Sequence, residues 1–175
     1  MSINNKLYKA AAPEAPYRFR ANIFMWPNRT LFFGPLQQLE FHAMGAVTIN
    51  VGLYQPFYMK TKSGAYAAYR CAVIPAGCKH ELQANGNIVA SLMIEKNSID
   101  FMRFRESIQA QASGFTHAMD TQWIDCFKKV YEEKPSKLVI HQMINQLLNV
   151  DASTEKNLDA RIDRIMHRIK GTSIN

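Results

Sequence analysis

The hydrophobic pattern of the chain changes character near residue 96. Between residues 30 and 94, short apolar runs alternate with polar positions, and turn residues rich in glycine and proline separate them. Val47, Ile49 and Val51 are an example of this alternation. Side chains two residues apart lie on one face of a strand, so the pattern predicts a series of short β-strands. Several short strands at this spacing predict a closed barrel or a sandwich.

The dipeptide Asn85-Gly86 is the strongest turn signal in this region. It lies between two strand-like runs, 81–83 and 88–94. Both residues tolerate positive φ, which a two-residue hairpin turn requires. The sequence therefore predicts a β-hairpin that pairs these two runs.

After residue 96 the apolar positions recur with the spacing of helices. Asn97 or Ser98 can cap a first helix, and Asp120 or Thr121 can cap a second. A third helix is predicted after Pro135, and its apolar stripe is the most regular in the chain. That stripe can pair with another helix, cover the barrel or pair with a second subunit. We expect it to form a dimer face, made by Val139, Ile140, Met143, Ile144 and Leu147.

Composition limits the class of protein. With 47% hydrophobic and 20% charged residues, the chain is typical of a globular domain. No stretch approaches about 18 consecutive apolar residues, so no membrane span is predicted. The three cysteines are an odd number and form no Cys-x-x-Cys motif, which indicates reduced thiols and a cytoplasmic location.

The net charge of +7 is compatible with work near nucleic acid but does not establish it. The basic residues are dispersed, which favours a generic solvated surface over a contiguous phosphate-binding footprint. Over residues 17–22 aromatic residues alternate with arginines, a pattern shared by strands and by sites for single-stranded nucleic acid. We interpret it as a half-buried first strand.

Two short stretches, 42–48 and 74–80, contain the candidate chemistry. Pro75, Gly77 and His80 in the second stretch resemble the Pro-x-Gly-x-x-His core of the second cupin motif, in which a turn is followed by a histidine that points into a small β-barrel. The first stretch occupies the place of the cupin His-x-His-x-x-x-Glu motif. Only its first histidine matches this sequence.

The candidate pocket therefore consists of His42, Met44, Thr48 and His80. Met44 stands where the cupin motif has its second histidine, and Thr48 stands where it has its glutamate. A catalytic metal usually has three or more protein ligands, and only two histidines remain here. We expect no metal, no cofactor and no catalytic residue, and no other catalytic motif is present.

The chain as a whole resembles the N-terminal half of AraC/XylS-type bacterial transcription regulators. The segments that carry this resemblance are 31–36, 42–47, 72–77 with His80, and Leu158-Asp159-Ala160-Arg161-Ile162, which resembles the entry to the DNA-binding domain of that family. The resemblance implies a cupin-like double-stranded β-helix, or jelly-roll barrel, followed by amphipathic helices. It also implies a regulatory module that senses an effector or dimerises, and that is not an enzyme.

The resemblance implies four parts along the chain. They are an N-terminal arm at 1–16, a cupin-like barrel at 17–96, a helical dimerisation region at 97–150, and a linker with the first helix of a truncated DNA-binding domain at 151–175. A helix is predicted from Asp159 to Lys170. The expected partners are a second copy of the chain and a small-molecule effector of unknown identity. DNA would be read only through helix-turn-helix units that this sequence lacks.

Two other interpretations remain open at this point. The chain could be a small stand-alone cupin enzyme, such as an isomerase or a metal-dependent oxygenase. It could also be a pure dimerisation module whose barrel is filled by large side chains such as Phe41, Tyr54 and Tyr69. A barrel with no cavity of about 300 Å³ or more would favour that last interpretation.

Overall fold

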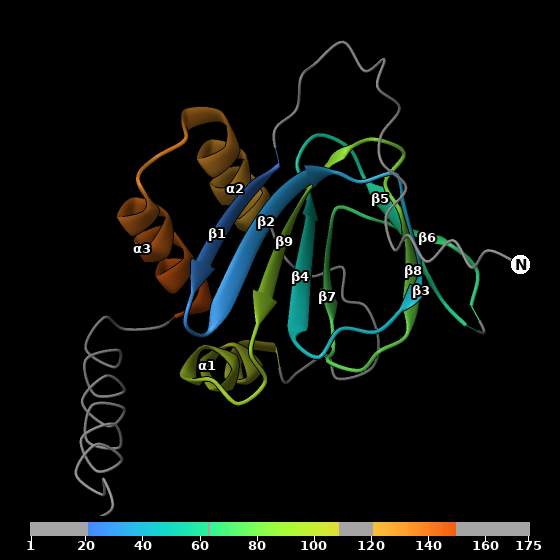
Figure 1. The fold of residues 1–175 in the computed structure, drawn as a ribbon, viewed down its shortest axis with the longest axis horizontal. Helices are drawn as coiled ribbons and strands as arrows, with labels where there is room; N and C mark the ends of the chain where they lie inside the picture. The colour runs from blue at the N-terminus through green and yellow to red at the C-terminus, as the bar shows by residue number, and fades with distance from the viewer. Residues whose placement is uncertain (1–20, 63, 109–120, 150–175) are drawn as a thin grey trace, which may run out of the picture.

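The computed structural model describes residues 21–62, 64–108 and 121–149, which form nine β-strands followed by three α-helices (Figure 1). The predicted mainly β fold with helices after it is confirmed. The elements are β1 (Asn22–Trp26), β2 (Arg29–Pro35), β3 (Gln38–His42), β4 (Val47–Gly52), β5 (Phe57–Thr61), β6 (Ala67–Tyr69), β7 (Cys71–Ile74), β8 (His80–Gln83), β9 (Ile88–Ile94), α1 (Ile99–Ile108), α2 (Thr121–Glu133) and α3 (Lys137–Leu148).

The strands form two antiparallel sheets that face each other as a jelly-roll barrel (Figure 1). The five-stranded sheet has the order β1-β2-β9-β4-β7, and the four-stranded sheet has the order β3-β8-β5-β6. Neighbouring strands are often far apart in sequence, so the chain crosses repeatedly from one sheet to the other. Within the described residues, no helix is long and apolar enough to cross a membrane.

The turn at Asn85-Gly86 is confirmed, but the hairpin predicted around it is wrong. Asn85 and Gly86 have φ values of 52° and 80°, and the amide of Asn87 donates to the carbonyl of Ala84 at 2.9 Å. However, β8 pairs with β3 and β5, whereas β9 pairs with β2 and β4. The turn therefore carries the chain from one sheet into the other, because turn chemistry sets the local backbone and not the sheet that the next strand joins.

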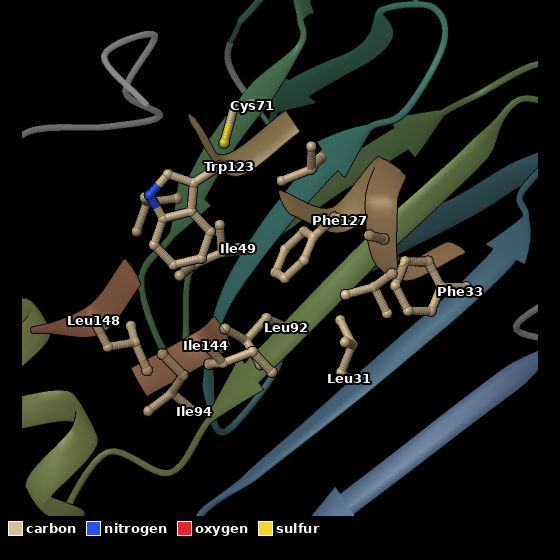
Figure 2. Packing of buried hydrophobic residues seen from close by; sticks show 14 of the residues in the cluster. Leu31, Phe33, Ile49, Cys71, Leu92, Ile94, Trp123, Phe127, Ile144 and Leu148 are labelled. Atoms are coloured by element: carbon tan, nitrogen blue, oxygen red, sulfur yellow. The ribbon is translucent and has the colours of Figure 1, made fainter. Parts of the chain in front are cut away.

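The outer face of the five-stranded sheet is apolar, and the helices cover it (Figure 2). Phe127 of α2 is fully buried and meets Phe33 of β2 edge to face, with ring centroids 6.2 Å apart. Trp123, one turn earlier on α2, packs against Phe127 in the same way at 5.6 Å. The buried side chains of this layer are Leu31, Phe33, Val47, Ile49, Val51, Leu53, Cys71, Val73, Ala90, Leu92, Ile94, Phe104, Trp123, Phe127, Val130, Ile140, Ile144 and Leu148.

The stripe of α3 that was predicted to form a dimer face lies partly within this layer. Ile140 and Ile144 have no exposed surface, because they pack onto the sheet of their own chain. Met143 and Leu147 lie partly buried at the edge of the same cluster, and Val139 is 41% exposed. Of the three roles left open for this stripe, the structure shows that it covers the barrel. The expected homodimer itself stays a prediction.

Serine side chains cap the N-termini of α1 and α3. Ser136 precedes α3, and its hydroxyl accepts a hydrogen bond from the amide of Val139. Ser98 does the same before α1, where it accepts from the amide of Phe101. The third helix ends at Asn149, which takes the left-handed conformation common at helix C-termini.

A buried arginine joins the barrel to two helices. Arg29, at the start of β2, is 2% exposed and pairs with Asp100 of α1 at 3.4 Å. Its guanidinium also donates to His141 Nδ1 at 2.7 Å and to the amide oxygen of Asn145, both on α3. It lies over the ring of Trp26, 5.6 Å from the centroid. The charge pair thus fixes α1 against the start of β2, and hydrogen bonds from the same guanidinium fix α3 there.

Several predictions fall outside the described residues. They are the arm at 1–16, most of the strand pattern at 17–22, the linker at 151–157 and the helix at 159–170. The β part that the structure describes runs from Asn22 to Ile94, within the predicted barrel at 17–96.

Candidate functional site

A cavity of about 450 Å³ lies inside the barrel, between the inner faces of the two sheets. This volume is within the range of about 300 to 1,000 Å³ that is usual for small-molecule sites. Ile23 of β1 lines the cavity and is itself 59% exposed. The lining residues are Ile23, Thr30, Phe32, Leu36, Leu39, His42, Met44, Thr48, Asn50, His80, Ser91 and Met93.

Strand alternation gives the five-stranded sheet its polar inner face. Thr48 and Asn50 of β4 line the cavity, whereas Ile49 between them belongs to the outer core. On β9, Ser91 and Met93 line the cavity in the same way, and they lie opposite Asn50 and Thr48 in the antiparallel register. The rest of the inner face is closed by apolar packing between the sheets, so the cavity occupies only part of the barrel.

A β-bulge in β3 directs His42 into the cavity. Leu39 pairs with Leu82 and His42 pairs with His80, so three steps along β3 match two steps along β8. One extra residue in β3 shifts the alternation that follows it. As a result His42 rather than Phe41 shares the inner face with Leu39, and Phe41 is 45% exposed.

The bulge brings together the two histidines of the two sequence motifs. The ring centroids of His42 and His80 are 4.4 Å apart. A tight turn fixes the approach to His80, because the amide of Cys78 donates to the carbonyl of Pro75 at 3.1 Å and Gly77 has a φ of 79°. The amide of Gly77 also donates to the carbonyl of Met44 at 2.8 Å, which ties the second motif to the first.

Both histidines are oriented by their own backbone neighbours. His80 Nδ1 lies 3.0 Å from the carbonyl oxygen of Cys78, and His42 Nδ1 lies 2.7 Å from that of Glu40. A carbonyl can only accept, so Nδ1 carries the proton in each ring and the opposite nitrogen, Nε2, is an acceptor when the ring is neutral. Burial lowers the pKa of His80 below its ordinary value, and the neighbouring His42 lowers it further.

Two polar atoms on β4 have no hydrogen-bond partner within the described protein. They are Thr48 Oγ1 and Asn50 Oδ1, and their residues are 5% and 4% exposed. The strand register explains why the Thr48 hydroxyl has no partner, because its cross-strand neighbours are the apolar Met93 and Ile74. Buried polar atoms are nearly always satisfied in native proteins, so two such atoms on one cavity wall indicate a place where a ligand or a water is bound.

The donor set of the cavity does not fit the metal that cupin enzymes use. Among the described residues, no group of three or more His, Cys, Asp or Glu side chains is placed to hold a metal ion. His42 and His80 supply two imidazoles, and the motif positions that would complete the site are Met44 and Thr48. A thioether suits only soft metals, and a hydroxyl is a weak ligand.

The structure thus brings all four predicted pocket residues to the wall of one cavity. Whether they bind a ligand stays a prediction. Of the large residues proposed to fill the barrel, Phe41 and Tyr54 are exposed. Tyr69 does lie between the sheets, where it stacks on Phe57, but it does not line the cavity. Sequence reasoning missed the other polar lining residues, although strand alternation outward from Thr48 could have found Asn50. They are Thr30, Asn50 and Ser91.

None of the three cysteines lines the cavity. Burial raises the pKa of Cys71 to about 12 and that of Cys126 to about 11, so both stay protonated and unreactive at neutral pH. Cys78 is partly buried, and the contact it makes with His80 is through its backbone carbonyl.

No protein-family profile and no curated protein matches the chain. Solved structures that resemble it include a cupin domain from Bordetella pertussis, with a TM-score of 0.37 and 10% identity over 43% of this chain and 92% of that one. An RmlC-like cupin from Desulfovibrio desulfuricans has a TM-score of 0.36 and 18% identity over 54% and 96% of the two chains. Oxalate decarboxylase from Bacillus subtilis has a TM-score of 0.32 and 14% identity over 66% and 31%.

Proposed function

We propose that this chain is the effector-sensing and dimerisation module of an AraC-type transcription regulator, and that it acts by binding a small molecule rather than by catalysis. The observation that carries the proposal is the cavity of about 450 Å³. It is lined by both of the short motifs on which the resemblance to that family rests, including His42 and His80. A cavity of this size also argues against a barrel that serves only as a dimerisation scaffold.

The covering helices offer a route by which an occupied cavity could alter a neighbouring domain. Thr48 and Asn50 face the cavity, and Ile49 between them packs against the layer that contains α2 and α3. A ligand that shifts Thr48 and Asn50 would therefore also shift Ile49, and with it the packing of β4 against the helices. The effector would need different affinities for two arrangements of this layer, because a ligand shifts an equilibrium only by its differential affinity.

The test of this proposal is the reading frame of the source gene beyond the codon for Asn175. We expect it to continue into a domain with two helix-turn-helix units, for which the segment Leu158–Ile162 would be the entry. A stop codon directly after Asn175 would remove the output domain and overturn the regulatory proposal.

The second candidate is a small stand-alone cupin enzyme, and the close pair of His42 and His80 is the observation that favours it. It predicts a bound metal in the purified protein and a turnover that the substitution His80→Ala abolishes. Metal analysis of the chain expressed in metal-supplemented medium tests it. Less than one metal ion for every ten chains after dialysis would count against this candidate.

A further inference from the structure

The charge of the cavity wall restricts what the cavity can bind. None of the described lining residues is Asp, Glu, Lys or Arg. His80 is 1% exposed, and burial keeps its pKa below the ordinary value, so this ring is neutral at neutral pH. A carboxylate or a phosphate brought into the cavity would lose its hydration and meet no opposite charge, which is strongly unfavourable. The wall therefore selects for uncharged molecules.

The polar atoms of the wall restrict the ligand further. Asn50 Oδ1 can only accept a hydrogen bond, and Thr48 Oγ1 lies two residues away on the same face of β4. His42 Nδ1 donates to the carbonyl of Glu40, so its other ring nitrogen is an acceptor when the ring is neutral. A wall with unsatisfied acceptors favours a ligand that donates a hydrogen bond.

From these observations we infer that the cavity binds an uncharged, largely apolar alcohol or phenol, whose hydroxyl donates to Asn50 Oδ1 and accepts from the hydroxyl of Thr48. The apolar part of such a ligand contacts Phe32, Leu36, Leu39, Met44 and Met93. This inference rests on the proposed function, because it names the ligand class of the same cavity. It specifies that the ligand is uncharged and that it donates a hydrogen bond, and the sequence motifs specify neither.

Three probes with one aromatic skeleton test the inference with the whole chain at neutral pH. They are 2-naphthol, which donates a hydrogen bond, 2-methoxynaphthalene, which does not, and 2-naphthoate, which is anionic. We expect 2-naphthol to bind about tenfold more tightly than the ether, the gain of one well-made buried hydrogen bond, and 2-naphthoate to bind most weakly. Isothermal titration calorimetry gives the three dissociation constants.

Two nearly isosteric substitutions locate the effect. In Thr48→Val and Asn50→Leu we expect the preference for 2-naphthol over the ether to fall to about threefold or less, while binding of the ether persists. Thr61→Val is the control, because it makes the same change on β5 at a residue that does not line the cavity. This control should keep the wild-type preference. Thermal melting of each variant verifies that it is folded.

Each contrary outcome has a distinct meaning. If 2-naphthoate binds most tightly, the cavity accepts anions and the ligand class is wrong, although the sensor proposal stands. If the ether binds as well as 2-naphthol, the hydrogen-bonding direction is wrong. If no probe binds, the ligand class is also overturned. The proposed function is judged separately in every case, by the reading frame beyond Asn175.

Discussion

The two faces of the five-stranded sheet differ in what they leave unsatisfied. On the outer face, Ile49 and its apolar neighbours are buried beneath α2 and α3 (Figure 2), and the buried Arg29 at the start of β2 pairs with Asp100 and Asn145. On the inner face, Thr48 and Asn50 border a cavity with polar atoms that have no partner in the described protein. The comparison indicates a division of labour within single strands. One set of alternate residues packs into the core, and the other leaves polar atoms unsatisfied at some cost in stability.

The largest loss of stability is expected when a buried side chain is removed from the outer face. Phe127→Ala deletes a fully buried ring that contacts Phe33 and Trp123. We expect it to lower the free energy of unfolding by about 3–5 kcal/mol, measured by urea denaturation. Met93→Ala on the inner face should cost less than half as much, because its side chain already borders a cavity. Equal losses for the two variants would contradict the comparison.

The second test breaks the charged contact that fixes α1 to the barrel. Asp100→Ala leaves the guanidinium of Arg29 without its carboxylate partner, while both residues are almost fully buried. We expect a loss of about 3 kcal/mol in the free energy of unfolding, since an unbalanced buried charge is costly. The control is Glu132→Ala, which removes an exposed hydrogen bond to Tyr54 and should change stability by less than about 0.5 kcal/mol.

A reversed pair of substitutions on β4 sharpens the comparison. Thr48→Val replaces an unsatisfied hydroxyl with a methyl group, and we expect it to stabilise the chain by about 1 kcal/mol. Ile49→Thr introduces a hydroxyl into the packed outer layer, and we expect it to destabilise the chain by about 2 kcal/mol. If Thr48→Val destabilises the chain, the Thr48 hydroxyl is hydrogen-bonded in solution, and the inner face does not leave it unsatisfied.

The smallest expected effect is a dependence on pH that comes from the inner face. The pKa of His80 is lowered in the fold, so the unfolded chain binds a proton more readily there. The contribution of His80 to stability is therefore fully present above the ordinary histidine pKa of about 6.5, and it is lost as the pH falls toward the lower folded value. Urea denaturation over this interval should show a smaller fall in His80→Gln than in wild type.

The sequence predicted the strands, the turn residues and the four pocket residues, because each of these depends on local alternation or a short motif. It did not predict which strands pair, so the turn at Asn85-Gly86 was placed correctly while the strands beside it were paired wrongly. The contacts of Arg29 were missed for a similar reason, since its partners on α3 lie more than 110 positions along the chain. An apolar stripe such as that of α3 also reads the same whether its own barrel or a second subunit covers it.

The bulge in β3 means that this strand contains one residue more than its partner strand needs between Leu39 and His42. The position of the bulge thus decides which side chain of β3 lies beside His80 in the cavity wall. At its present position an imidazole enters the barrel. If the surplus were moved past His42, the ring of Phe41 would take that place and plug the cavity. Deleting Phe41 would remove the surplus and keep the histidines paired, so this wall should tolerate the loss of a residue better than a slip of one.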